Sequence, residues 1–337
     1  MSSKQLAELS QIYIMKALDK DPEIPTRTLA RHLAENHAGL FPSIEIARSC
    51  VKLKRGANGN KDRHLQTVSN VKRRINVPDS DTAPERTEPV NVALQGHWTI
   101  ISDIHAPYHS KPAIEAALEH SDKIAATDGL LINGDLIDFY QASKWSRNPN
   151  ARRINDELTM VREFMKELSR CYPRIIYKFG NHERRFTSYL YANAPEIADM
   201  PCLKLEQLFV NNKEKIEFEG KIEFIGAQQI IYAGDYLTIL HGHEFASSAF
   251  SPVNPARGAF LRAKTNCIVG HHHKPSAHVE TDARRVVTST FSLGCLSDLS
   301  PPYAPVNSYT HGFATMHMDG NDFEVSNYRI TKDYKVR

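Results

Sequence analysis

The sequence predicts an α/β domain built in layers, preceded by a small all-helical unit. Two observations support this prediction. Between residues 98 and 192, short apolar runs alternate with segments of helical periodicity, and beyond about residue 213 strand-like runs dominate. Alternating strands and helices followed by a strand-rich half are typical of a layered sandwich. A chain of 337 residues has room for one large domain and a small appendage.

Residues 1–75 are expected to form the helical unit. Apolar residues from Leu6 to Ala17 recur at helical spacing, and Pro25-Thr26 is expected to open a second helix. Pro42-Ser43 is expected to open a third, with Ser43 as its N-cap. Three short helices with tight connections resemble a helix-turn-helix unit, although most small helical bundles bind no DNA.

A linker and the larger domain are expected to follow. Residues 76–92 are polar and rich in proline, a composition typical of a linker. Residues 93–337 are then expected to form the larger domain. Its strand-like runs are 98–102, 129–133, 174–179, 221–225, 229–232, 236–240, 284–290, 311–318 and 322–330. Its helix-like segments are 111–121, 151–169 and 183–192.

A basic stretch lies at the end of the helical unit. Nine basic residues between positions 48 and 74 stand against one acid, Asp62, a local excess of about eight charges. The nine are Arg48, Lys52, Lys54, Arg55, Lys61, Arg63, Lys72, Arg73 and Arg74. Such an excess favours binding to a polyanion, so nucleic acid is the expected partner. The alternative is a solvated helix face followed by a tail that binds nothing.

Five short clusters of carboxylate, imidazole and carboxamide side chains follow strand-like runs. They are Asp103-Ile104-His105, Gly134-Asp135, Gly180-Asn181-His182-Glu183, His241-Gly242-His243 and Gly270-His271-His272-His273. Parallel α/β sheets gather functional loops at the carboxyl ends of their strands, so distant clusters are expected to converge on one crevice. The recurring glycine beside these residues is expected to let the backbone turn sharply.

The order D-x-H, G-D-x-x-D, G-N-H-E, H-G and G-H-x-H resembles the calcineurin-like metallophosphoesterase superfamily over roughly residues 97–330. This resemblance implies a double β-sheet sandwich flanked by helices, with two divalent metals between the loops. It implies seven metal ligands, which are Asp103, His105 and His273 for one ion, Asn181, His241 and His271 for the other, and Asp135 between both. It also implies that His182 is the catalytic residue rather than a ligand.

The chemistry of phosphate ester hydrolysis agrees with this residue set. Two metals about 3.5–4 Å apart lower the pKa of a bridging water, which becomes the hydroxide nucleophile, and neutralise the phosphoryl oxygens. Imidazole and oxygen ligands without thiolate favour manganese, iron, zinc or cobalt, and manganese is expected from the resemblance and the share of oxygen ligands. His182 is expected to protonate the leaving oxygen or to bind a phosphoryl oxygen.

Several neighbouring residues are candidates for supporting roles. Arg184 and Arg185 follow the G-N-H-E motif and are candidates for substrate phosphate binding, with a salt-bridged helix start as the alternative. His243 and His272 lie within motifs as non-ligands and are further candidates for substrate contact. Asp138 is a candidate for orienting a ligand histidine, and its alternative role is that of a loop or helix cap.

The sequence also departs from one subgroup of the resembled family. Serine/threonine protein phosphatases usually show Asp-Arg-Gly after Gly-Asp, and an arginine before Gly-Asn-His-Glu. Here Phe139 follows Asp138, and Phe179 precedes Gly180. A protein phosphatase is therefore disfavoured.

Bulk composition indicates the compartment but not the substrate. The net charge of +3 is nearly balanced. Five scattered cysteines without a C-x-x-C pair argue against a disulfide framework. No apolar signal core or membrane-length run is present, so we expect a cytoplasmic protein without a membrane partner.

The leading functional hypothesis is a dinuclear-metal-dependent phosphodiesterase or nuclease that acts on nucleic acid. Its first alternative is a small-molecule phosphatase or nucleotide pyrophosphatase. An alternative of another class is a DNA-binding regulator with a vestigial metal site. The intact ligand set argues against that regulator, because a degenerate site is expected to have lost a ligand.

Overall fold

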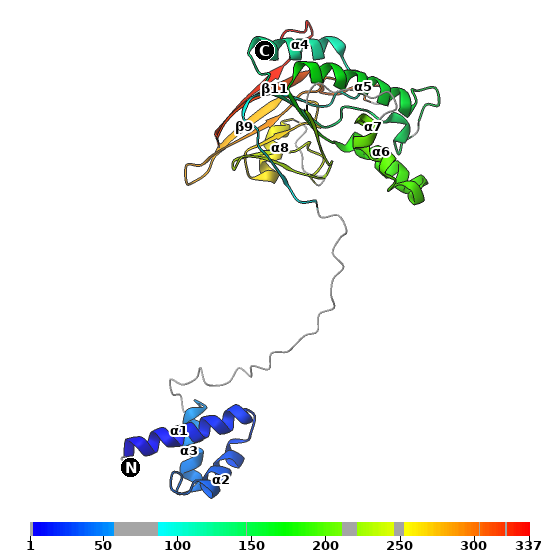
Figure 1. Ribbon diagram of the computed structural model, residues 1–337. Coiled ribbons are helices and arrows are strands. Elements are labelled where there is room, and N and C mark those ends of the chain that lie inside the picture. The colour runs from blue at the N-terminus through cyan, green and yellow to red at the C-terminus, as the bar shows by residue number, and fades with distance from the viewer. Residues whose placement is uncertain are drawn as a thin grey trace. The chain divides into compact units, whose positions relative to one another are not determined.

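The computed structural model of the chain describes residues 3–56, 87–145, 147–210, 221–245, 253–302, 304–320 and 322–337. The chain divides into two compact units, Met1–Ala83 and Pro84–Arg337 (Figure 1). Most of the predicted linker, residues 76–86, lies outside the described residues. The end of the predicted linker contains β1 (Val90–Val92), which pairs with β6 (Ile231–Ala233) of the larger unit.

The first unit contains the three predicted helices, α1 (Ser3–Lys20), α2 (Thr26–Asn36) and α3 (Ile44–Lys54). The Ser43 hydroxyl caps α3 by accepting a hydrogen bond from the Ile46 N–H at 3.3 Å, as its residue type predicts. The core of the unit is formed by Ile14, Leu29, Ala30, Leu33, Phe41, Ala47 and Val51. Whether these helices bind nucleic acid stays a prediction.

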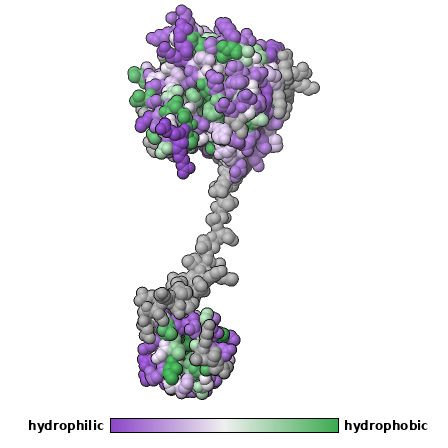
Figure 2. Space-filling model, turned by 90° about the vertical axis from the view of Figure 1, so that its left-hand side faces the viewer, coloured by the Kyte–Doolittle hydropathy of each residue, from purple (hydrophilic) through white to green (hydrophobic). Residues whose placement is uncertain are grey.

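The surface of the first unit mixes polar and apolar side chains (Figure 2). Among residues 3–56, five large hydrophobic residues are each 40% exposed or more, namely Ile12, Met15, Ile44, Ile46 and Leu53. The basic side chains of α3 therefore share this surface with apolar ones, and the unit is not uniformly charged.

The second unit is built on two mixed six-stranded sheets flanked by helices, which confirms the predicted sandwich. One sheet has the order β1-β6-β7-β8-β10-β9 and the other β12-β11-β2-β3-β4-β5. The strands not yet given bounds are β2 (Gly96–Ile101), β3 (Gly129–Asn133), β4 (Arg174–Lys178), β5 (Lys221–Ile225), β7 (Leu237–Ile239), β8 (Cys267–Val269), β9 (Ser276–Thr281), β10 (Val287–Ser292), β11 (Gly312–Asp319) and β12 (Asp322–Arg329). The helices are α4 (Lys111–Lys123), α5 (Ile154–Cys171), α6 (Asn181–Asn193), α7 (Leu205–Val210) and α8 (Pro255–Ala263).

Alternation along the central strands creates two cores. Successive strand residues point to opposite faces, so Leu131 packs between the sheets while its neighbours Leu130 and Ile132 pack in the core that α4 and α5 cover (Figure 1). Ile176 and Ile175 divide in the same way on β4. Burial on both faces explains why these strands read as continuous apolar runs.

Helices α7 and α8 and strands β1 and β9 are among the elements that were not predicted from the sequence. Helix α8 has nine residues and contains Gly258, and the Asn254 side chain caps it by accepting from the Arg257 N–H at 3.0 Å. Strand β9 is an edge strand with no fully buried residue. Neither has the long apolar periodicity that identifies an element from sequence.

The structure also describes the state of the cysteines and the character of the helices. All five cysteines are free thiols. Within the described ranges, no helix combines the length and the apolar character that a membrane crossing requires.

Candidate metal centre

The five polar clusters lie at the ends of β2, β3, β4, β7 and β8. The first three strands are neighbours in one sheet, and the last two are neighbours in the other. The Asn133 side chain joins the two sheets by donating to the Leu240 carbonyl at 2.8 Å, and the His241 Nδ1–H donates to the Asn133 carbonyl at 2.7 Å. The clusters therefore converge at the carboxyl ends of these strands, where the two sheets are joined, as predicted.

The turns at these strand ends differ from the expectation in one respect. Five candidate ligands themselves have left-handed backbone φ values between 51° and 65°, namely Asp103, His105, Asp135, His271 and His273. This region is uncommon for residues other than glycine, and it concentrates at functional sites. Gly180 is needed for space instead, because a Cβ there would meet the Asp135 carboxylate.

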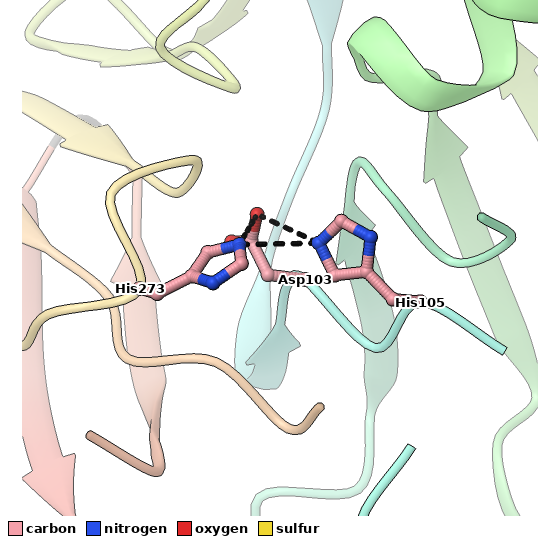
Figure 3. A group of neighbouring side chains, drawn as sticks. All are labelled: Asp103, His105 and His273. Atoms are coloured by element: carbon pink, nitrogen blue, oxygen red, sulfur yellow. Dashed lines mark hydrogen bonds and ion pairs between the residues drawn. The ribbon is translucent and has the colours of Figure 1, made fainter. Parts of the chain in front are cut away.

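Asp103, His105 and His273 form the first candidate ligand group, three side chains close enough together to hold a metal ion (Figure 3). The Nε2 atoms of the two histidines are 3.1 Å apart, and Asp103 Oδ1 lies 3.2 Å from His273 Nε2. All three side chains are buried. Two ring nitrogens that point at one carboxylate oxygen in a buried place form a donor set suited to a cation.

Asp135, His241 and His271 form the second group. His241 Nε2 lies 3.2 Å from Asp135 Oδ2. Asn181 begins α6 and precedes His182, whose N–H donates to Asp135. The Asn181 Oδ1 is buried, and within the described residues it accepts no hydrogen bond. Buried polar atoms usually have a partner, so an unpartnered carbonyl oxygen here fits a role as a ligand. The residue types of both groups thus fit divalent ions.

Each of the two aspartates presents one oxygen to the cluster and uses the other for a hydrogen bond. Asp103 Oδ2 accepts from the His271 N–H at 2.9 Å, and Asp135 Oδ1 accepts from the His182 N–H at 2.9 Å. Asp135 Oδ2 faces His241 of one group and, at 3.8 Å, His105 of the other. A bridging role for Asp135 would therefore use one oxygen, Oδ2.

Hydrogen bonds fix which nitrogen the candidate ligand histidines direct into the cluster. A backbone carbonyl only accepts, so the bond from His241 Nδ1 to Asn133 places a proton on Nδ1 and directs Nε2 toward Asp135 Oδ2 at 3.2 Å. His105 Nδ1 lies 3.2 Å from Asp138 Oδ1, which favours the same tautomer. Asp138 thus contacts a candidate ligand histidine, as one of its two predicted roles requires.

Burial and mutual charge shift the pKa values across the cluster. Burial alone would raise the pKa of Asp103 and of Asp135, but the surrounding histidines hold both pKa values below the ordinary value. Burial opposes the charge of His241, yet Asp135 and Asp103 raise its pKa to about 10. Burial lowers the pKa of His271 to about 3. The cluster therefore holds two carboxylates in their anionic form.

His182 lies beside both groups. Its Nδ1 is 2.9 Å from Asp138 Oδ1, and its Nε2 is 2.8 Å from an Arg185 guanidinium nitrogen. Arg185 also donates to the Asp138 carbonyl at 2.9 Å. His105, Asp138 and His182 form a third group close enough to hold a cation. Burial opposes the ionisation of Asp138, but its two histidine neighbours lower its pKa.

The remaining substrate candidates lie in different surroundings. Arg184 is exposed, whereas Arg185 contacts His182. The rings of His241 and His243 are 5.4 Å apart, and those of His271 and His272 are 5.2 Å apart. Burial lowers the pKa of His243 to about 4.

Glu183 has a role that the sequence argument missed. Its carboxylate accepts N–H bonds from Asp135 at 3.0 Å, Leu136 at 2.8 Å and Gly180 at 2.6 Å, and the Tyr177 hydroxyl donates to it at 2.6 Å. Burial raises its pKa. Glu183 thus ties the loop after β3 to the start of α6. Its place in the G-N-H-E motif was visible, but its partners depend on the fold.

The structure describes four of the nine basic residues proposed for nucleic acid. Arg55 donates to Thr26 Oγ1 at 2.6 Å and to the Ile24 carbonyl at 2.6 Å, so its guanidinium has a structural role. Arg48 pairs with exposed Glu45 at 3.5 Å, and Lys54 donates to Gln11 at 3.3 Å. Lys52 is partly buried. The other five, Lys61, Arg63, Lys72, Arg73 and Arg74, lie outside the described residues.

Comparison with known proteins identifies the family of the larger unit. The model of the calcineurin-like phosphoesterase family matches residues 97–303. The Gene 54 protein of Mycobacterium phage L5 is 24% identical over 236 residues, which is 66% of this chain and 88% of the relative. The Gene 54 protein of Mycobacterium phage D29 is 22% identical over 240 residues, 66% of this chain and 89% of the relative.

Solved structures with low sequence identity are also similar. Zinc-bound Vps29 of Entamoeba histolytica is 12% identical with a TM-score of 0.37, and the match covers 72% of this chain and 96% of that one. Vps29 of Chaetomium thermophilum is 12% identical with a TM-score of 0.36, covering 72% and 95%.

Proposed function

The chain belongs to the calcineurin-like phosphoesterase family, and we propose that it is a dinuclear-metal-dependent phosphodiesterase or nuclease acting on nucleic acid. The observation that carries this proposal is the convergence of two ligand groups on a pair of buried aspartates. In this proposal, Asp103, His105 and His273 hold one ion. Asn181, His241 and His271 hold the other, and Asp135 lies between them.

Two bound divalent ions would neutralise phosphoryl oxygens and activate a water nucleophile. The residues of the chain supply the remaining functions. His182 is held by Asp138 on one ring nitrogen, which leaves Nε2 directed toward Arg185. A guanidinium only donates, so in the structure Nε2 accepts from Arg185. In the proposed reaction Arg185 binds a phosphoryl oxygen instead, and Nε2, after taking up a proton from solvent, donates that proton to the leaving oxygen. His243 and His272 are proposed to contact other parts of the substrate.

Manganese is the proposed metal. The seven proposed ligands are four imidazoles, two carboxylates and one carboxamide, a mixture without thiolate. Such a mixture suits manganese, and it also suits iron, zinc and cobalt. Titration of the metal-free protein with each ion, followed by activity measurement, ranks them.

The helical unit is proposed to supply affinity for nucleic acid. Its support is the charge excess between residues 48 and 74. Because the Arg55 guanidinium bonds within the unit, the proposed phosphate contacts fall to the other eight basic residues.

The test compares hydrolysis of bis-p-nitrophenyl phosphate with that of p-nitrophenyl phosphate in the presence of manganese. We expect a higher kcat/KM for the diester. A strong preference for the monoester would favour a small-molecule phosphatase instead. No hydrolysis of either compound by fully metal-loaded protein would contradict the proposed chemistry.

A further inference from the structure

Lys178 and Glu244 form a buried ion pair that contacts the loop carrying His241 of the second ligand group. Lys178 is the last residue of β4 and is 0% exposed, and its ammonium lies 2.6 Å from Glu244 Oε1. The ammonium also donates to the Ala227 carbonyl at 3.3 Å and the Phe179 carbonyl at 3.5 Å. Lys178 therefore has three acceptors for its three donors.

Glu244 uses both oxygens to hold the loop that carries His241. Its Oε1 accepts from the His241 N–H at 3.0 Å, and its Oε2 accepts from the Gly242 N–H at 2.6 Å. The Lys178 ammonium faces this carboxylate inside the protein, 2.6 Å from Oε1. The loop backbone is thus fixed by a charged carboxylate, which forms stronger hydrogen bonds than a neutral acceptor.

The pair connects two different strand ends. Lys178 ends β4 three residues before Asn181, and Glu244 lies three residues after His241 beyond β7. β4 and β7 belong to different sheets. Asn181 and His241 are the two proposed ligands of one ion that come from these strand ends. In the described part of the chain, no hydrogen bond or ion pair joins Lys178 or Glu244 to Asp103, His105 or His273.

Stability alone does not account for such a pair. Removing two charges from water costs several kcal/mol for each ion, and apolar replacements of a buried pair are often neutral or stabilising. Groups that orient metal ligands, in contrast, typically change metal affinity 10–100-fold when they are lost. The contacts of Glu244 with the His241 loop are of this orienting kind.

We propose that Lys178 and Glu244 are positioning residues that set the spacing between Asn181 and His241 and so determine the affinity of the second metal position alone. This inference rests on the proposed dinuclear site. It assigns no role to the pair in the first position, which Asp103, His105 and His273 form.

The test is metal titration by calorimetry of the metal-free full chain and of the double variant Lys178→Met/Glu244→Gln. Removing both charges together leaves no unpaired buried charge. We expect affinity for one ion to fall 10–100-fold, affinity for the other to change less than about threefold, and the unfolding temperature of the metal-free protein to stay near the wild-type value.

The matched control is Arg174→Met/Glu223→Gln. This pair also bridges from β4, with distances of 3.0 and 3.2 Å, and Arg174 donates as well to the Ala93 carbonyl. We expect both metal affinities of the control to stay at the wild-type values. If Lys178→Met/Glu244→Gln does not fold, Glu244→Asp replaces it, since aspartate keeps the charge beside Lys178 while its shorter side chain no longer reaches the His241 and Gly242 N–H groups in the same geometry.

Combination with ligand variants identifies the affected position. In a His273→Ala background the remaining ion occupies the second position, and removing the Lys178–Glu244 charges should still lower its affinity. In a His271→Ala background the remaining ion occupies the first position, and removing these charges should leave its affinity unchanged. Equal affinities in wild type and the double variant, or equal losses at both positions, would overturn the inference. Failure of the wild type to bind two ions would instead contradict the proposed function.

Discussion

The two units of the chain place their polar side chains in opposite environments. In the larger unit Asp103, Asp135 and His241 are at most 1% exposed, and hydrogen bonds fix the atoms that they present. In the helical unit the basic side chain of Arg48 is 37% exposed and pairs with an exposed glutamate, Glu45. Substitutions in the first environment are expected to have large, local effects. Those in the second are expected to have smaller effects that depend on salt.

The largest effect is expected for Asp135→Asn. Asp135 Oδ2 faces histidines of both ligand groups, so the change should weaken both metal positions. Because metal ions supply several kcal/mol of transition-state stabilisation, we expect kcat/KM to fall on the order of 10⁴-fold. Asp128→Asn is the control, since Asp128 accepts the His97 N–H away from the cluster. Wild-type rates in Asp135→Asn would contradict the assignment.

A somewhat smaller loss is expected for His182→Ala. The variant should keep its metals and lose roughly 10²–10⁴-fold in turnover, the usual range for a positioned acid or base. The loss should shrink for a good leaving group such as p-nitrophenolate, which needs little protonation. His317→Ala, an exposed histidine on β11, is the control. If the loss is equal for all leaving groups, His182 orients phosphate instead, and if metal is lost, His182 is a ligand.

Binding of nucleic acid tests the proposed role of the basic helical unit. If four to six basic residues contact phosphates, log affinity should fall with log salt at a slope of roughly −4 to −5. A chain that begins at Thr87, whose hydroxyl donates to the Gln228 carbonyl at 3.1 Å, should keep its rate on a small diester. It should lose rate on long DNA or RNA. Salt titration of fluorescent duplex and single-stranded oligonucleotides measures both chains, and equal affinities would assign the helical unit another role.

A still smaller effect is expected on stability. Burial, reinforced by Asp138, raises the pKa of Glu157 to about 8. The folded state then binds the proton more tightly than the unfolded state, so stability should fall as the pH rises from about 4.5 to about 8. The cost is at most about 3 kcal/mol at pH 7. Glu157→Gln should remove this slope from thermal unfolding curves of the larger unit, and an unchanged slope would contradict the pKa.

The sequence predicted the parts of the fold that follow from local patterns. Leu130 to Ile132 are apolar because both faces of β3 are buried, and Ser43 precedes α3 because its hydroxyl caps the helix. The helix α8 and the edge strand β9 lack such patterns, so only the packed structure identifies them.

The candidate site was predictable as a set of residues but not as a network. Motif order indicated Asp135 and His241, whose proximity the structure confirms. The partners that hold them, Glu183 and the pair Lys178–Glu244, come from other strand ends. Their roles depend on contacts between sheets, which no local pattern contains. Arg55 shows the opposite error. Its charge predicted contact with nucleic acid, whereas its guanidinium forms hydrogen bonds within the helical unit.

The central claim is that the buried cluster holds two divalent ions. Its most direct test is elemental analysis of the full chain after loading with manganese and removal of unbound ions. We predict two ions per wild-type chain, and fewer in Asp135→Asn. A wild-type chain that retains no ion, or a variant that retains two, would contradict the claim.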